Sequence, residues 1–364
     1  MMKNLNMNAR NVVSDSMNKH KFSYRWKLSD LANVKKNGCK VFSCFSCGGG
    51  SSMGYKLAGY EVMGNCEIDP AINKIYVKNN HPKYNYLMDI RDFINKEVPE
   101  ELKDLDILDG SPPCSTFSMA GSREESWNKE KKFREGQKEQ TLDDLFFWFI
   151  KAVEKLKPKV YIAENVKGLI AGNAKGYVNQ IVRELDEIGY TVQIFLLNSA
   201  SMGVPQRRER VFVIGHRKDL DFEKLHLAFN EQPIFYREFA DENYIALNKD
   251  TATYFRWQNR KKTDSSIGDT VKRAEKGKIS GFTTNYIKMS DIPRTMTAGS
   301  RPIRFDKPGY ITDRDVRLIQ SFPEDYDFNG NDAQYVCGMS VPPVMMANIA
   351  SEVYEQWLKG ENND

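Results

Sequence analysis

Between residues 40 and 215 short apolar runs alternate with helix-like segments, and this alternation constrains the fold more than any other feature of the chain. Strands are expected at 40–45, 61–69, 106–109, 160–164, 191–197 and 211–214. A helix is expected to begin at Tyr55, and others are expected at 71–79, 142–156 and 179–188. Strands alternating with helices form a parallel sheet with both faces covered. The sequence therefore predicts an α/β fold with a doubly wound, Rossmann-like sheet.

After Gly215 the alternation stops, and residues 217–310 mix aromatic, basic and polar side chains without a repeat. Helix-like patterning returns at 312–321 and 344–358. We therefore expect a body formed by 38–215 and 330–364, with a second, smaller domain at 216–329. Residues 1–37 are interpreted as an N-terminal extension, either a tail or a helix docked on a later element.

Charge is unevenly distributed between these parts. Residues 251–304 contain 12 Lys and Arg against 4 Asp and Glu, a net charge of +8 in a chain whose total is +4. Such a segment is either a surface that faces a polyanion or a solvated basic loop region, and charge alone does not separate the two.

The chain lacks an apolar run of 18 residues, and its N-terminus is polar and Asn-rich, so neither a membrane span nor a secretory signal is expected. Six cysteines in 364 residues are too few for a disulfide framework. Together these features favour a reducing, cytoplasmic setting.

A glycine-rich loop, Phe45 to Gly50, lies between the first expected strand and a helix. Glu67 and Asp69 follow about 20 residues later, where a carboxylate would hold ribose hydroxyls. The pattern indicates a nucleotide-type site, although such a turn can also be structural. The spacing of the glycines in this loop departs from G-x-G-x-x-G, which disfavours a dinucleotide dehydrogenase. Asp89, in Met88-Asp89-Ile90, closes a further candidate strand between 61–69 and 106–109, and it is either an acceptor for an adenine amino group or an exposed loop acid.

A second group of candidate residues lies at strand ends further along the chain. Cys114 follows Pro112-Pro113 at the end of one strand, and Glu164 ends another. A thiol and a carboxyl at one sheet edge suit a nucleophile and a proton-handling group. A buried structural thiol and a helix cap are the alternatives. Arg208 and Arg210 would grip a phosphate or a base carbonyl, or form a surface ion-pair cluster.

From about Lys40 to Trp357 the chain resembles the C5-cytosine DNA methyltransferases, because short motifs occur in that family's order. They are Phe45-Ser46-Cys47-Gly48-Gly49-Gly50, Glu67-Ile68-Asp69, Asp89-Ile90, Pro112-Pro113-Cys114 with Phe117-Ser118, Leu145-Phe146-Phe147, Glu164-Asn165-Val166, Gln206-Arg207-Arg208-Glu209-Arg210, Arg317 to Pro323, and Gly338-Met339-Ser340-Val341-Pro342.

The resemblance implies S-adenosylmethionine as methyl donor, with S-adenosylhomocysteine as product. The residues implied to bind it are Phe45, Gly49, Gly50, Glu67, Ile68, Asp89, Ile90, Pro113 and Leu145. The family departs from this chain at Cys47, where it usually has Gly, at Ser43, where it usually has Asp, and at Met339, where it usually has Asn. The last departure puts one polar cofactor contact in doubt. No metal site is expected.

The resemblance also implies roles in catalysis. Cys114 would add to C6 of a cytosine flipped out of duplex DNA, and Glu164 would hydrogen-bond N3. Arg210 would contact O2, with Arg208 on a phosphate or supporting the loop. Residues 115–140 would close over the flipped base, unless they are a disordered insertion.

The 216–329 domain would recognise the DNA target. Six basic residues are expected to contact nucleic acid, mostly through phosphates: Arg256, Arg260, Lys261, Lys262, Lys272 and Arg273. The alternatives are a tRNA cytosine-C5 methyltransferase on the same scaffold and a catalytically silent DNA-binding protein. We expect a monomer, with any cognate restriction endonuclease acting separately.

Overall fold

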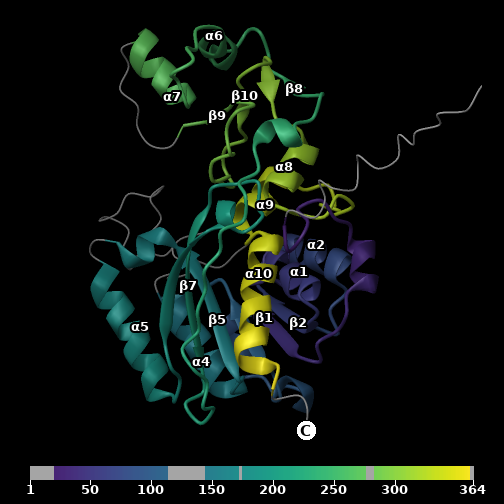
Figure 1. Cartoon of the computed structure of the whole chain (residues 1–364), viewed down its shortest axis with the longest axis vertical. Coiled ribbons are helices and arrows are strands. Elements are labelled where there is room, and N and C mark those ends of the chain that lie inside the picture. Colours follow the sequence, from purple (N-terminus) through teal and green to yellow (C-terminus); the bar gives the residue numbers. More distant parts are fainter. Residues whose placement is uncertain (1–19, 114–143, 172–173, 276–282, 361–364) are drawn as a thin grey trace, which may run out of the picture.

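The computed structural model describes residues 20–113, 144–171, 174–275 and 283–360, and within them the largest element is a seven-stranded sheet in the order β3-β2-β1-β4-β5-β7-β6. Figure 1 shows this sheet in the lower part of the molecule. Its strands are β1 (Lys40–Cys44), β2 (Glu61–Glu67), β3 (Tyr84–Leu87), β4 (Ile107–Gly110), β5 (Val160–Val166), β6 (Gln193–Asn198) and β7 (Glu209–His216). The predicted α/β class with a doubly wound sheet is confirmed.

One strand departs from the predicted parallel arrangement. β7 runs antiparallel to both of its neighbours, β5 and β6, so a wholly parallel sheet was wrong for this strand. The connection 199–208 holds a short 3-10 turn rather than a crossover helix, and a connection without a crossover reverses the chain direction. As a result, Arg210 at the start of β7 lies at the edge where the parallel strands end.

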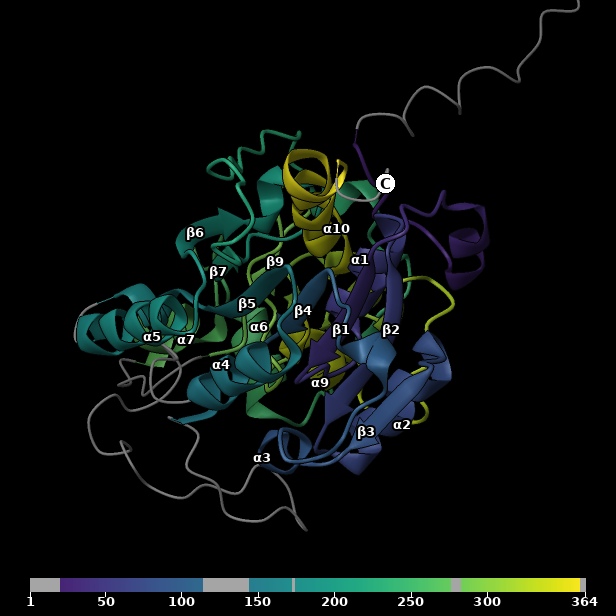
Figure 2. The same ribbon diagram turned by 90° about the horizontal axis from the view of Figure 1, so that it is seen from below.

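Helices cover both faces of the sheet (Figure 2). On one face, α1 (Gly50–Leu57) and α10 (Pro343–Val353) pack against alternate strand residues such as Val41 and Ile107. On the other face, α3 (Ile90–Phe93) and α4 (Leu145–Leu156) pack with α5 (Lys175–Glu187) over residues such as Phe42 and Leu108. This split follows from side chains pointing alternately to the two faces of each strand.

Helix boundaries near the glycine loop differ from the expected ones. α1 begins at Gly50, five residues before the predicted start, so the loop leads directly into the first helical turn. α2 (Pro70–Asn80) follows β2, and Asp69 caps it by accepting from the backbone N–H groups of Ala71 and Ile72. Asp69 therefore serves the helix rather than the end of a strand.

A smaller unit is built around a four-stranded sheet in the described residues, in the order β8-β11-β10-β9. Its strands are β8 (Ile245–Ala246), β9 (Tyr286–Ile287), β10 (Ile303–Arg304) and β11 (Gly309–Tyr310), with α6 (Ala252–Gln258) and α7 (Ile267–Thr270) beside them. Figure 1 shows this unit above the large sheet, with α8 (Asp313–Ile319) and α9 (Ala333–Met339) between the two. Its own buried apolar cluster is small: Leu247, Ile267, Tyr286 and Ile303.

Two peripheral segments are also placed. Residues 217–229 lie along the body, where Phe222 stacks on Trp357. From residue 20 onward the N-terminal extension docks on the protein, because Trp26 is 5% exposed and donates its indole N–H to the carbonyl of Ser321. Residues 1–19 lie outside the described residues. Among those that are described, we find no helix with the length and apolar character needed to cross a bilayer.

Candidate active site

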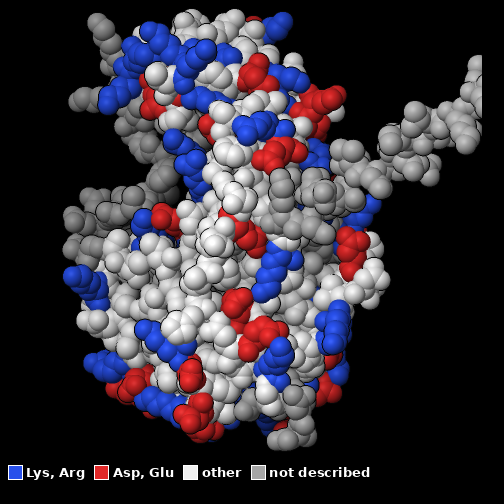
Figure 3. Space-filling view, in the orientation of Figure 1, with Lys and Arg blue, Asp and Glu red and all other residues white. Residues whose placement is uncertain are grey.

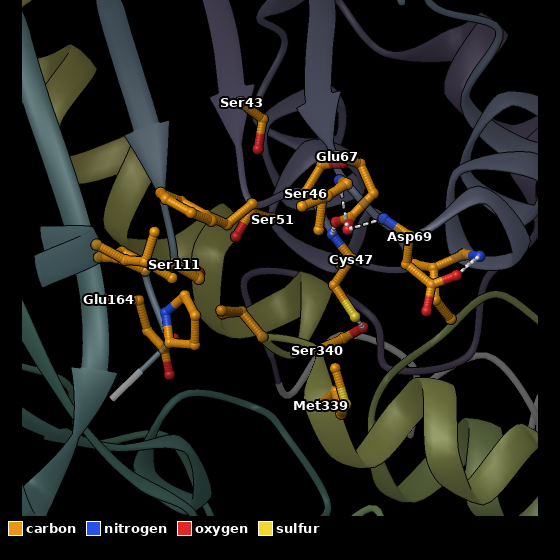
Figure 4. Close-up of a pocket in the computed structure, with 18 of the residues that line it drawn as sticks. Ser43, Ser46, Cys47, Ser51, Glu67, Asp69, Ser111, Glu164, Met339 and Ser340 are labelled. Atoms are coloured by element: carbon orange, nitrogen blue, oxygen red, sulfur yellow. Dashed lines mark hydrogen bonds between the residues drawn. The ribbon is translucent and has the colours of Figure 1, made fainter. Parts of the chain in front are cut away.

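A cavity of about 560 Å³ opens at the edge where the parallel strands of the large sheet end. The structure brings most of the predicted site residues to its walls (Figure 4). These are Phe45, Gly50, Glu67, Ile68, Asp89, Ile90, Pro113, Leu145, Glu164, Arg208 and Arg210. Gly49 is not among the lining residues, and Cys114 lies outside the described residues, directly after Pro113.

The glycine loop has an unusual backbone. Phe45 and Cys47 have φ angles of 53° and 47°, in the left-handed backbone region that residues with a Cβ atom rarely adopt. Gly49 caps α1 with φ 79°, and a Cβ on it would lie 2.2 Å from the Nδ2 atom of Asn80 on α2. A Cβ on Gly50 would lie 2.0 Å from the carbonyl oxygen of Val341. Gly49 and Gly50 thus allow close packing against α2 and the C-terminal segment.

At one end of the cavity, neutral donors hold the carboxylate of Glu67. The backbone N–H groups of Ile68 and Asp69 donate to Oε1 at 2.9 and 3.0 Å, and that of Cys47 donates to Oε2 at 2.9 Å. Burial raises the pKa of Glu67, while these hydrogen bonds oppose the shift. The result is a carboxylate fixed in orientation beside the apolar side chains of Phe45 and Ile68.

Asp89 does not close a strand, because β3 ends at Leu87 and Asp89 caps α3. Its side chain accepts from the backbone N–H of Arg91 at 2.8 Å and forms an ion pair with the Arg91 guanidinium at 3.1 Å. It still lines the cavity next to Ile90. A ligand there would meet a carboxylate that is already anchored.

The other end of the cavity holds an ion pair. Nε of Arg210 lies 2.9 Å from Oε1 of Glu164, and the two side chains are 14% and 11% exposed. The strand register explains the contact. Val166 of β5 pairs directly with Arg210 of β7, and Glu164, two residues before Val166, lies on the same face of the sheet. Burial lowers the pKa of Arg210, and the neighbouring Glu164 carboxylate acts against that shift. The pair forms a polar surface at a largely buried site.

The prolines that precede Cys114 are tied to the same strand. Nδ2 of Asn165 donates to the carbonyl of Pro112 at 3.2 Å, so β5 supports the chain that leads to the thiol. Pro113 lines the cavity, and it is the last described residue before Cys114. The expected loop at 115–140, with Phe117 and Ser118, lies outside the described residues.

Arg208 has a different environment from Arg210. Its side chain is buried, with Nη1 donating to the carbonyl of Met296 and Nη2 to that of Gly338, each at 3.0 Å. Gly338 permits this close approach, since a Cβ there would lie 2.5 Å from the backbone N of Ala298. Arg208 therefore joins the segment at 296–298 to the wall of the cavity, which matches a supporting role rather than a phosphate contact.

Sequence reasoning named Ser340 only as part of a motif and Met339 as a departure from the family's usual Asn, and both residues line the cavity. The hydroxyl of Ser340 lies 3.6 Å from Sγ of Cys47, and burial raises the pKa of this thiol to about 12. Met339 is 44% exposed. Ser43, Ser46 and Ser51 add hydroxyls to the cavity. The sequence had marked Ser43 only as a departure from the family and Ser46 only as part of the glycine-rich motif, and it had not named Ser51.

In the smaller unit, the six basic candidates fall into two groups. Arg256 pairs with Glu275 at 2.8 Å, Arg273 pairs with Asp264 at 2.6 Å, and the guanidinium of Arg260 lies 3.6 Å from the centre of the Trp257 ring. The exposed candidates are Lys261, Lys262 and Lys272. Figure 3 shows Lys and Arg side chains gathered over the part of this unit that carries α6 and α7.

Comparison with known proteins identifies what this arrangement is similar to. Residues 39–355 match the family model described as C-5 cytosine-specific DNA methylase. The chain is 30% identical to the Type II methyltransferase M.NgoPII of Neisseria gonorrhoeae, covering 87% of this chain and 96% of the relative. It is 29% identical to M.FnuDI of Fusobacterium nucleatum, covering 87% and 94%.

Solved structures show the same fold at lower identity. A prophage protein of Escherichia coli described as a DNA modification methyltransferase superposes with a TM-score of 0.64 at 19% identity, covering 88% of this chain and 99% of that one. A DNMT2 variant from Spodoptera frugiperda gives 0.61 at 16% identity, covering 87% and 100%.

Proposed function

The chain belongs to the C-5 cytosine-specific DNA methylase family, and from that premise we propose that the cavity at the sheet edge binds S-adenosylmethionine at one end and a flipped-out cytosine at the other. Membership confirms the predicted DNA (cytosine-5-)-methyltransferase and does not favour the tRNA or the silent alternative. The observation that carries the proposal is that Glu67 and the Glu164–Arg210 pair open into one cavity.

The Glu67 end of the cavity fits the proposed cofactor. Glu67, fixed by backbone N–H groups, would accept from the ribose hydroxyls, and Asp89 with Ile90 would meet the adenine. Apolar walls from Phe45, Pro113 and Leu145 suit an aromatic base. S-adenosylmethionine, when bound, supplies an electrophilic methyl group carried on a sulfonium.

At the other end, the residues suit activation of cytosine. We assign Cys114 as the nucleophile whose sulfur bonds to C6, which raises the electron density at C5. Glu164 holds a proton at N3, where negative charge would otherwise develop, and Arg210 donates to O2. Because Arg210 binds Oε1 of Glu164, one contact orients both groups toward the same base.

The reaction closes when the protein is released from the methylated ring. A base removes the proton from C5, the C5–C6 double bond re-forms, and the bond between C6 and the Cys114 sulfur breaks. A cytosine stacked inside a duplex cannot reach a buried pair such as Glu164 and Arg210, so the base must be flipped out.

We further propose the division of labour between the parts of the chain. Residues 38–215 and 330–364 carry the catalytic site, and residues 216–329 carry the surface that contacts double-stranded DNA. The exposed lysines on the smaller unit support this assignment. We also propose that the methyltransferase acts as a monomer and that any cognate restriction endonuclease acts as a separate protein.

Tritium transfer tests the proposed substrate. Purified protein is incubated with methyl-labelled S-adenosylmethionine and either duplex DNA or tRNA, and the labelled nucleoside is identified. We expect label in DNA as 5-methylcytosine. Label confined to tRNA, or found on another nucleoside, would contradict the assignment.

A further inference from the structure

Asp109 is a buried carboxyl at the centre of the large sheet that the proposed chemistry does not use. It lies on β4, is 1% exposed, and pairs in register with Ser43 of β1 and Ile162 of β5. It does not line the cavity, but Ser43, which does (Figure 4), donates a hydrogen bond to it. A buried carboxyl needs such partners to offset its desolvation.

The donors to Asp109 come from both sides of the glycine loop. The hydroxyl of Ser43, before the loop, donates to Oδ2 at 2.8 Å. After the loop, the hydroxyl of Tyr55 donates to Oδ1 at 3.3 Å. One side chain on β4 therefore ties the end of β1 to α1.

The loop between these anchors needs external support. Phe45 and Cys47 hold positive φ angles that cost free energy and persist only where the surroundings fix them. The same loop supplies Phe45 and the Cys47 N–H that holds Glu67. If the two ends of the loop moved, the cofactor end of the cavity would change shape.

We propose that Asp109 is a positioning residue that holds the glycine loop in its cofactor-binding conformation through the hydroxyls of Ser43 and Tyr55. The inference rests on the proposed binding of S-adenosylmethionine in this cavity. Asp109 touches neither the cofactor nor the reacting base in this account and acts through the loop alone.

A reciprocal exchange provides the test, because Ser43 and Asp109 face each other in register. The variants are Asp109→Ser, Ser43→Asp and the double exchange. Affinity for S-adenosylhomocysteine is measured by calorimetry, and hydrogen exchange of residues 45–57 is measured in the ligand-free protein. Asp109→Ser should weaken affinity by about tenfold or more, since buried hydroxyls lose their acceptor. Loop exchange should accelerate, while turnover at saturating cofactor should change little.

The double exchange should recover most of the affinity and the slow exchange. Asp106→Asn is the matched control, because Asp106 is likewise a buried aspartate but binds the backbone N–H of Lys40 at the other end of β1 and β4. It should leave affinity unchanged. If the Asp109→Ser variant does not fold, the affinity and the hydrogen exchange of the double-exchange variant alone test the inference.

A double exchange no better than the sum of its single changes, or Asp109→Ser with normal affinity and normal exchange, would overturn the inference. If the unmodified protein itself failed to bind S-adenosylhomocysteine, the proposed function would fail instead. The two failures are therefore distinguishable.

Discussion

Carboxylates are held by different partners in the large sheet and in the smaller unit. In the large sheet, hydroxyls donate to Asp109 and backbone N–H groups donate to Glu67. In the smaller unit, Asp264 is bound by Arg273 and Glu275 by Arg256. Neutral donors orient a carboxylate without cancelling its charge, whereas an ion pair neutralises it. The body thus orients Glu67 beside its cavity without neutralising it through an ion pair, and the smaller unit uses arginines for its own structure.

This contrast clarifies which basic residues are available to DNA. Among the six basic candidates, the three arginines make ion pairs or stack on Trp257, whereas Lys261, Lys262 and Lys272 are exposed. Ion pairs also occur in the body, where Arg91 binds Asp89 and Arg210 binds Glu164, the latter at the end of the cavity that we assign to the base.

The largest effect is expected where the body does chemistry. Glu164→Gln keeps the shape of the side chain but cannot donate a proton to N3, so turnover should fall by about 10²- to 10⁴-fold. Affinity for S-adenosylhomocysteine should change little. Single-turnover kinetics and calorimetry measure both quantities.

Glu209→Gln is the matched control for that variant, because Glu209 is a neighbouring exposed glutamate that pairs with Lys167 at 3.0 Å. It should retain near-normal turnover. Equal losses in the two variants would mean that Glu164 acts only through local charge.

The junction between the two regions should be the next most sensitive place. Arg208→Met leaves the buried carbonyls of Met296 and Gly338 without their donor, which should lower the free energy of unfolding by about 2–4 kcal/mol. Urea denaturation measures this change. Arg207→Met, at an adjacent exposed arginine, should have little effect on stability. If both variants were equally stable, Arg208 would not join the regions as described.

The two kinds of carboxyl should respond to pH in opposite directions. Burial raises the pKa of Asp109 to about 7, so its protonated form is favoured in the folded protein, and stability should fall as pH rises from about 4 to about 7. The hydrogen bond from Arg273 lowers the pKa of Asp264 to about 2, so stability should rise with pH between about 2 and about 4.

Urea denaturation across pH checks both windows. Asp109→Asn should remove the slope in the upper window, and Asp264→Asn the slope in the lower one. Burial also raises the pKa of two other carboxyls, Glu67 and Asp315, and these groups would contribute to the same upper window. An unchanged upper slope in Asp109→Asn would assign it to one of these groups.

A smaller effect is expected on the surface of the smaller unit. Changing Lys261, Lys262 and Lys272 to Gln should weaken binding to cognate and unrelated DNA alike. The salt slope of log K should fall by about 0.9 for each phosphate that the protein no longer neutralises. Lys83→Gln with Lys103→Gln, at the β3 side of the body, is the control and should leave the slope unchanged. If the first set also left it unchanged, this surface would not face DNA.

The smallest effect is expected at Cys47. Cys47→Ser retains a polar atom near the Ser340 hydroxyl and leaves the backbone N–H on Glu67 in place. Affinity for S-adenosylhomocysteine should change by less than about tenfold. A decrease as large as that of Asp109→Ser would show that the thiol itself contacts the cofactor.

Much of the body could be predicted because its site is local in sequence. Strand ends carry the motifs, and the carboxyl ends of parallel strands meet at one edge, so Glu67, Asp89, Pro113 and Glu164 converge. The direction of β7 was missed because apolar patterning reports that a strand is buried and not which way it runs.

Partners that are distant in sequence could not be predicted. Arg208 binds carbonyls 88 and 130 residues away, and no local pattern marks those positions. Likewise, the pairing of Arg256 with Glu275 depends on how α6 packs beside the following turn. For this reason the sequence treated all six basic candidates of the smaller unit alike, although three have internal partners.

Covalent trapping tests the central claim, that Cys114 attacks a flipped cytosine in this cavity. The protein is incubated with S-adenosylmethionine and duplexes carrying 5-fluorocytosine at varied sites, and the cross-linked peptide is identified by mass spectrometry. Two other thiols, Cys47 and Cys66, line the same cavity, but burial raises the pKa of each, so both are poor nucleophiles. We predict an adduct on Cys114 that is absent from Cys114→Ser. An adduct on Cys47 or Cys66, or none at all, would contradict the account.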